Sequence, residues 1–200
     1  MVVSGSVKPF PYFVIDGYLS PDRVKSINDE WPADWLKEDG SFNRKWSTTN
    51  LPPSAKDVVD AVDLRMVEGL TGIRGLFPDP KMFGGGLHCI PSGGFLNMHV
   101  DFNRHPMGWT RRVNMLVYLN ETWQDEWGGH LCLGLENQQK IAPIGGRCVI
   151  FETTDKSWHG HPEALTCPVD VQRRSLAMYF YTADPPKGEA HSTIYKKVKR

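Results

Sequence analysis

Two residues in the middle of the chain, His99 and Asp101, have the types and spacing that suit them to bind a metal. They lie in 95–101, a segment typical of a β-strand, and side chains two residues apart on a strand point to the same face. The opposite face of this segment is apolar and suits a core. An imidazole beside a carboxylate supplies two of the three ligands in the two-histidine, one-carboxylate triad that holds non-haem Fe(II) with coordination positions left open.

The remaining ligand of such a triad must come from a distant strand, and His159 and His161 are the two candidates. His159 lies far enough after Asp101 for several strands to intervene. His161 is followed by Pro162, so we expect it to sit where the strand turns off and to cap or hydrogen-bond a loop. We therefore favour His159 as the third ligand.

An arginine on a later strand is a candidate anion anchor. In 173–181, Arg174 shares a face with the large apolar side chains of Leu176, Met178 and Phe180. A charge on such a face is too costly to bury without a partner. A carboxylate ligand bound through both guanidinium arms satisfies it, and so does a structural salt bridge, which is the simpler explanation of the arginine taken alone. Tyr118, on the mixed face of 112–119, is either a helper at the same carboxylate or an ordinary core tyrosine.

The composition bounds the class of protein. The 200 residues carry 23 Lys and Arg against 23 Asp and Glu, which gives no electrostatic reason to expect nucleic acid or an anionic membrane as a partner. No apolar run is long enough to span a bilayer, and no secretory signal opens the chain. Four scattered cysteines form no Cys-x-x-Cys pair, which argues against a zinc–cysteine site and favours a reduced, cytoplasmic protein.

The order of elements predicts an α+β, mainly β fold. We expect a strand over 8–15, a helix from Pro21 to about Trp31 with Ser20 as its N-cap, a loop over 33–50, and one further helix from Pro52 to Gly72. Strands follow at 86–90, 95–101, 112–119, 130–134, 147–152 and 174–182, separated by glycine turns. Short strands at this spacing suit a double-sheet jelly roll of the cupin type, braced by the N-terminal helices. We expect a single domain over 1–200, with the strand and helices in about 1–75, the jelly-roll core in about 76–185, and a tail over 186–200 whose last residues are solvated.

His99-x-Asp101, His159 and Arg174, in this order, make the chain resemble the Fe(II)- and 2-oxoglutarate-dependent dioxygenases, in particular the prolyl 4-hydroxylase-like branch. The resemblance covers most of the chain, and it includes the segments 9–16, 86–88, 93–96, 111–120, 128–131, 151–153 and 159–162. It implies a double-stranded β-helix core.

The resemblance also implies the cofactors and the residues that hold them. Fe(II) would be bound by His99, Asp101 and His159, and the distal carboxylate of 2-oxoglutarate by Arg174 with help from Tyr118. His88 is either a cosubstrate contact or a structural histidine. The implied reaction oxidises an unactivated C–H bond with O2, turns 2-oxoglutarate into succinate and CO2, and has ascorbate as a supporting reductant.

The substrate implied by the resemblance is a prolyl or other residue of a protein, or a free amino acid or small metabolite. We expect Asn103, Arg104 and Trp109, which follow Asp101 closely, to contact it, with an ordinary surface loop as the alternative. The same two alternatives apply to a possible lid over 41–49.

Two other classes of protein use a similar core. A non-catalytic cupin-like module that binds or senses the metal or 2-oxoglutarate is one, and the intact ligand set argues against it. A zinc hydrolase is the other, but it has no need of Arg174.

Overall fold

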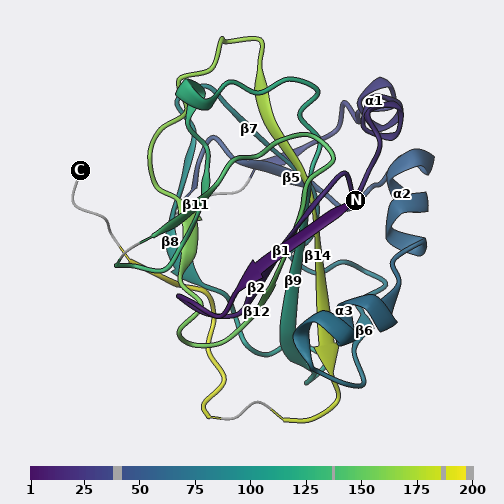
Figure 1. Ribbon diagram of the computed structural model, residues 1–200, viewed down its shortest axis with the longest axis vertical. Coiled ribbons are helices and arrows are strands. Elements are labelled where there is room, and N and C mark those ends of the chain that lie inside the picture. The colour runs from purple at the N-terminus through teal and green to yellow at the C-terminus, as the bar shows by residue number, and fades with distance from the viewer. Residues whose placement is uncertain (38–41, 137, 186–187, 197–200) are drawn as a thin grey trace.

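The computed structural model describes residues 1–37, 42–136, 138–185 and 188–196. Within these residues two antiparallel sheets face each other, and the helices cover the outer side of the larger one (Figure 1). The larger sheet has the order β1 (Val2–Ser6), β2 (Tyr12–Asp16), β12 (Cys148–Glu152), β9 (Thr110–Tyr118), β14 (Gln172–Thr182), β7 (Gly86–Pro91), β5 (Trp46–Thr48) and β3 (Leu36–Lys37), and β6 (Phe77–Pro78) pairs with β14. The smaller sheet has the order β11 (Gln139–Ile141), β10 (Leu131–Leu133), β13 (His159–His161), β8 (Phe95–Val100) and β15 (Ile194–Tyr195), and β4 (Phe42–Asn43) pairs with β8.

This mainly β arrangement with helices on one side confirms the predicted fold class. The strands expected from about residue 86 onward are present with their ends shifted by one or two residues. Short pairings such as β5, β6 and β11 were not predicted. β15, which pairs with Val100 and His99 of β8, lies within the expected C-terminal tail. Residues 186–187 and 197–200 of that tail, and Ser41 of the expected lid, lie outside the described residues.

The helices follow from local capping signals. α1 (Pro21–Asp29) begins where the Ser20 hydroxyl accepts a hydrogen bond from the Arg23 backbone N–H at 3.3 Å. The single helix expected from Pro52 to Gly72 is wrong, because the chain forms α2 (Pro53–Asp60) and α3 (Leu64–Thr71). The Asp63 side chain accepts from the Arg65 N–H at 2.9 Å, so it starts a new helix instead of continuing the old one.

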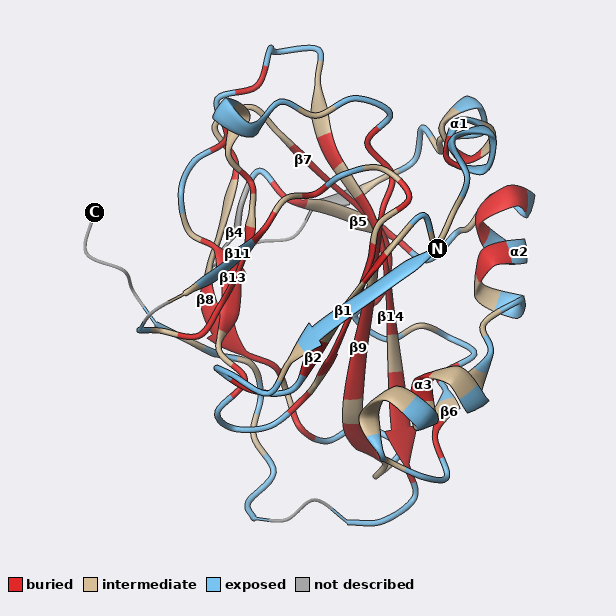
Figure 2. Cartoon of the chain, in the orientation of Figure 1, coloured by how far each residue is buried: buried red, intermediate tan, exposed pale blue. Residues whose placement is uncertain are grey.

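The central strands of the larger sheet, β9 and β14, are buried on both faces, whereas the edge strand β1 is exposed (Figure 2). One face packs against the helices through every second residue of β9 and β14, namely Val113, Met115, Val117, Leu176, Met178 and Phe180. The other face meets the smaller sheet through a second cluster that includes Tyr118, Phe151 and Leu133. Each large apolar side chain buried in these layers stabilises the fold by about 1.5–3 kcal/mol. Polar side chains on the second face therefore point toward the smaller sheet and the space between the two.

An irregularity in β9 changes which side chains face that space. Ser175 and Tyr179 of β14 lie opposite Tyr118 and Asn114, but Tyr181 lies opposite Arg111 because the register shifts by one residue between Phe180 and Tyr181. This bulge places Arg111 on the same face as Asn114, although strict alternation along the strand would place it on the helix side.

No helix among the described residues is both long and apolar enough to cross a bilayer.

Candidate metal centre

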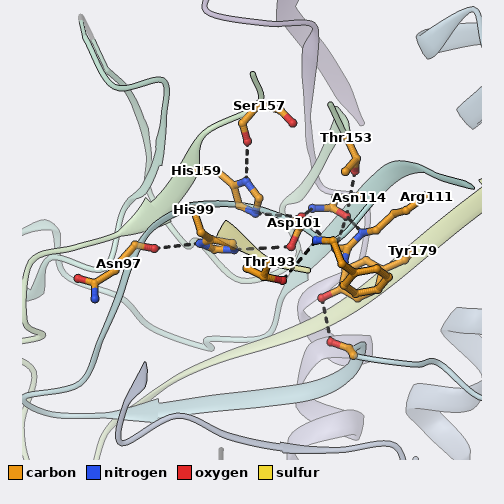
Figure 3. A network of polar contacts seen from close by, with 12 residues as sticks. Asn97, His99, Asp101, Arg111, Asn114, Thr153, Ser157, His159, Tyr179 and Thr193 are labelled. Carbon is orange, nitrogen blue, oxygen red and sulfur yellow. Dashed lines mark hydrogen bonds and ion pairs between the residues drawn. The ribbon is translucent and has the colours of Figure 1, made fainter. Parts of the chain in front are cut away.

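His99, Asp101 and His159 meet between the two sheets (Figure 3). β13 runs antiparallel to β8 with His159 opposite His99, which brings the two imidazole rings to 4.2 Å between centroids. Gly160 permits this approach, since a Cβ at this position would lie 2.8 Å from backbone oxygens of β8. Asp101 follows directly after β8, and its two carboxylate oxygens lie 3.6 Å from His99 Nε2 and 3.3 Å from His159 Nε2. Three nitrogen and oxygen donors thus converge, all within 4.8 Å of one another.

Backbone carbonyls fix the orientation of both imidazoles. His99 Nδ1 donates to the Asn97 carbonyl at 2.9 Å, and His159 Nδ1 donates to the Ser157 carbonyl at 2.9 Å. Each Nε2 is then the lone-pair atom and faces Asp101. Burial, together with the charge of His99, lowers the pKa of His159 to about 4, so this imidazole is neutral at pH 7 and able to bind a metal.

The Asp101 carboxylate is held by two residues of β9. Arg111 Nη2 forms an ion pair with Oδ2 at 3.0 Å, and Asn114 Nδ2 donates a hydrogen bond to the same oxygen at 2.7 Å, which leaves Oδ1 for a metal. Burial raises the pKa of Asp101, but Arg111 and the two histidines outweigh it and hold the pKa well below its usual range. Arg111 also lies 3.4 Å above the Tyr179 ring. Sequence reasoning missed Arg111 because only the bulge in β9 turns it inward.

A cavity of about 320 Å³ adjoins the triad, and its charge is mostly positive. Asp101 is the one acidic residue that lines it among those described, against three cationic side chains, Lys45, Arg111 and Arg173. Since Arg111 is paired with Asp101, the cavity carries an excess of positive charge, which favours an anionic ligand.

Arg173 is the buried arginine of this cavity. Its Nε donates to the Gly129 carbonyl at 2.7 Å and its Nη2 to the Tyr118 hydroxyl at 3.4 Å. No Asp or Glu in the described part of the chain forms an ion pair with it, although the residue is only 6% exposed. Burial lowers its pKa, while Tyr118 opposes the shift.

The expectation that Arg174 enters the cavity is wrong. Its Nη1 donates to Asn28 Oδ1 at 2.8 Å and its guanidinium lies 4.4 Å from the centre of the Trp31 ring, on the helix side of the sheet. The physical reason is that the helices cover the large-apolar face of β14, whereas the second sheet covers the face of Arg173. Tyr118 does lie on the inner face, where its hydroxyl contacts Arg173.

Two further histidines line the cavity with unsatisfied nitrogens. His161 ends β13, as expected from the proline that follows it, but neither of its ring nitrogens has a partner among the described residues, so no hydrogen bond to a described loop is formed. His88 on β7 has a buried Nε2 that likewise has no partner in the described part of the chain. Burial, and then the nearby cations, lower the pKa of both imidazoles well below the usual value. Buried polar atoms without partners indicate a bound polar ligand.

The three expected substrate contacts have different surroundings. Asn103 is buried and bonds to the backbone at Glu189 and His191, and Trp109 stacks on His105 at 4.7 Å, so neither faces the cavity. Arg104 is exposed and lines a second, outer depression.

Comparison with known families identifies the chain. A family model described as the 2OG-Fe(II) oxygenase superfamily matches residues 85–181, which contain the triad and Arg173. The match shows that residues 85–181 form a domain of this superfamily. Its cofactors are Fe(II) and 2-oxoglutarate, and it is a 2-oxoglutarate-dependent dioxygenase. The donor set fits the metal, since two neutral imidazoles and a carboxylate are the ligands of a non-haem iron triad.

Solved structures agree on the fold. A prolyl-4-hydroxylase from Pseudomonas putida is similar with a TM-score of 0.60 and 21% identity, covering 86% of this chain and 92% of that one. HygX from Streptomyces hygroscopicus, crystallised with nickel, 2-oxoglutarate and hygromycin B, has a TM-score of 0.64 and 16% identity, covering 86% of this chain and 82% of that one. A prolyl hydroxylase from Trichoplax adhaerens, in complex with a hypoxia-inducible-factor peptide, has a TM-score of 0.61 and 18% identity, covering 85% of this chain and 83% of that one. No curated protein sequence matches the chain.

Proposed function

We propose that this chain is a hydroxylase that holds Fe(II) through His99, Asp101 and His159 and binds the distal carboxylate of 2-oxoglutarate through Arg173. The observation that carries the proposal is the buried Arg173 guanidinium, which has no acidic partner among the described residues and lines the same small cavity as the triad. An arginine fork matches a carboxylate in shape and charge, and pairing removes the cost of burying an isolated cation.

The side chains around the cofactors have distinct tasks. His99 Nε2, His159 Nε2 and Asp101 Oδ1 present the donor atoms, while Arg111 and Asn114 contact Oδ2 and hold the carboxylate in place. When bound, Fe(II) and 2-oxoglutarate would supply the oxidation of a C–H bond by O2, with one oxygen atom entering the substrate, the other entering succinate, and CO2 released.

Besides Arg173, the cavity contains other polar groups that could hydrogen-bond to 2-oxoglutarate. We assign the unsatisfied nitrogens of His88 and His161 to contacts with 2-oxoglutarate, in addition to Arg173. Tyr118 contributes by fixing Arg173, since its hydroxyl already accepts from that guanidinium.

The substrate is a peptide or a small molecule. Similar structures carry both kinds, a hypoxia-inducible-factor peptide in one case and hygromycin B in another. We also propose a cytoplasmic location, supported by the four buried cysteine thiols, all of which are free.

Anaerobic titration with Fe(II) tests the metal site. His99→Ala should weaken Fe(II) binding by more than about 100-fold, since loss of a group that merely orients a ligand already costs 10- to 100-fold. His161→Ala is the matched control, because this buried histidine stands two residues from His159 and should leave Fe(II) affinity within about threefold. Equal Fe(II) affinity in wild type and His99→Ala contradicts the assignment.

A further inference from the structure

An outer groove of about 680 Å³ adjoins the inner cavity. It lies between loop 102–108 and the C-terminal segment 190–193, with Phe83 as part of its wall. Phe83, Phe102 and Thr193 line both the groove and the inner cavity, so the two spaces meet at these residues. In Figure 3, Thr193 lies beside the triad, which shows how near this boundary is to the metal ligands.

The volumes of the inner cavity and the outer groove indicate which ligand each one holds. The inner cavity, about 320 Å³, is at the low end of the 300–1,000 Å³ that small-molecule sites occupy. It has to accommodate the metal, 2-oxoglutarate and the carbon to be oxidised. Most of the substrate must therefore lie in the outer groove.

The groove has an apolar wall and one cation that has no partner among the described residues. Phe83 is 47% exposed, and its ring meets that of Phe102 edge-on at 5.5 Å, which gives an apolar surface open to a ligand. Arg104 is the one Arg, Lys, Asp or Glu among the lining residues in the described part of the chain. No hydrogen bond or ion pair of its guanidinium is formed within those residues, whereas His191, also in the wall, is paired with Asp155 at 2.9 Å.

The loop that carries Arg104 is held rigidly. Asn103 bonds through its side chain to the Glu189 carbonyl and to the His191 N–H, each at 2.9 Å. On the other side of Arg104, His105 Nε2 donates to the buried Asp79 at 3.2 Å. Ordering a loop costs conformational entropy, and a loop already fixed before binding spares a ligand that cost. An arginine on an unconstrained surface loop would lack such support from its neighbours.

The guanidinium of Arg104 lies beside Gly108. The φ of Gly108, +88°, is a conformation that favours glycine, and a Cβ there would lie 3.8 Å from Arg104 Nη2. The side chain of Arg104 is therefore folded across the turn of its own loop, beside the groove.

We infer that Arg104 is a specificity-determining residue that binds the carboxylate of a small organic acid, whose apolar part lies against Phe83 and Phe102. The inference rests on the proposed function, since the groove leads to the proposed metal centre. It favours a carboxylate-bearing small molecule over a neutral one, because the groove offers a cation and, among its described lining residues, no acid. Arg173 is separate from this site and serves the cosubstrate.

Matched pairs of acid and amide test the inference. Ni(II)-loaded protein saturated with 2-oxoglutarate, which blocks Arg173, is titrated calorimetrically with 3-phenylpropionate, hexanoate and N-acetyl-leucine, and with the neutral amide of each. In wild type the tightest acid should bind about tenfold more strongly than its amide, as expected for loss of a charge-assisted hydrogen bond. Arg104→Gln should reduce that ratio to about one, and Arg104→Lys should retain part of it. Arg65→Gln, which removes another exposed arginine, on α3, should leave the ratio unchanged.

The outcomes separate this inference from the proposed function. If Ni(II) and 2-oxoglutarate bind but wild type shows no preference for any acid, or binds none of the six compounds up to the solubility limit, the role of Arg104 is refuted. An unchanged ratio in Arg104→Gln refutes it as well. Failure of the protein to bind 2-oxoglutarate at all contradicts the proposed function instead.

Discussion

Replacing the two adjacent arginines of β14 separates the cosubstrate anchor from a structural arginine. Arg173 lies in the inner cavity without an acidic partner among the described residues, and Arg174 lies on the helix side against Asn28 and Trp31. Both Arg173→Gln and Arg174→Gln remove one positive charge from neighbouring positions of the same strand. Any difference between them therefore reports on the face that each side chain occupies.

The size of the effect follows from the hydrogen bonds that each substitution removes. Arg173→Gln removes a charged fork that would donate two hydrogen bonds to a carboxylate, each contributing about 1.5–3 kcal/mol. A total of about 3–6 kcal/mol corresponds to roughly a 150- to 25,000-fold rise in the dissociation constant of 2-oxoglutarate. Arg174→Gln breaks the hydrogen bond to Asn28 and the contact with Trp31, so we expect about 1 kcal/mol less stability and a dissociation constant within about twofold of wild type.

The assay is anaerobic calorimetric titration of 2-oxoglutarate into the Ni(II)-loaded variants. Urea unfolding of each variant shows whether it is folded, and Arg173→Lys, which keeps the charge but loses the fork, should have an intermediate affinity. Equal 2-oxoglutarate affinity in wild type and Arg173→Gln refutes the assignment of Arg173. A drop in affinity in Arg174→Gln as large as that in Arg173→Gln refutes the argument from the two faces.

Three further variants or conditions test other parts of the site. Arg111→Gln should raise the pKa of Asp101 and weaken Fe(II) binding by about 10- to 100-fold, measured by anaerobic titration at several pH values; an unchanged affinity would show that Arg111 does not hold the carboxylate. Gly129→Ala places a Cβ 3.0 Å from Arg173 Cδ at a φ of +69°, so it should lower 2-oxoglutarate affinity at least about tenfold while Fe(II) affinity stays the same. The metal-free protein should lose stability between pH 7 and pH 5, because His159 takes up a proton in that range when the chain is unfolded but not when it is folded, where its pKa is about 4. This histidine alone should lower the free energy of unfolding by about 2 kcal/mol at pH 5, measured by urea unfolding. A free energy of unfolding that does not change with pH would contradict the burial of His159 as a neutral imidazole.

The convergence of the three proposed metal ligands was predictable because it depends on local periodicity. His99 and Asp101 share a strand face whatever the rest of the fold does, and His159 is pinned by the neighbouring Gly160, which lets β13 approach β8. The position of Tyr118 on the inner face of β9 followed from the same alternation.

The choice between Arg173 and Arg174 was not predictable in the same way. Alternation separates the two side chains, but it does not say which face meets the site when both faces are buried. The face with Leu176, Met178 and Phe180 packs on the helices, so the prediction that the residue sharing this face, Arg174, enters the site was wrong.

Arg111 and the C-terminal strand β15 depend on features that the sequence does not display. A bulge moves Arg111 to the inner face, and no residue type in 110–113 marks it. β15 pairs only two residues, and Tyr195 there lies 5.3 Å from the His99 ring. So short a pairing depends on tertiary contacts and has no periodicity of its own.

Succinate formation from 2-oxoglutarate in air tests the central claim most directly. Wild type loaded with Fe(II) should release succinate, at a rate raised by carboxylate-bearing substrates, and Asp101→Ala, which removes the carboxylate donor of the triad, should release none above the protein-free background. The folding of Asp101→Ala is checked by urea unfolding, and His130→Ala, which removes a histidine that is paired with Asp125 and is not one of the proposed metal ligands, should match wild type. No succinate from wild type with any amino acid, peptide or organic acid, or equal succinate from Asp101→Ala, would contradict the assignment of this site as a dioxygenase centre.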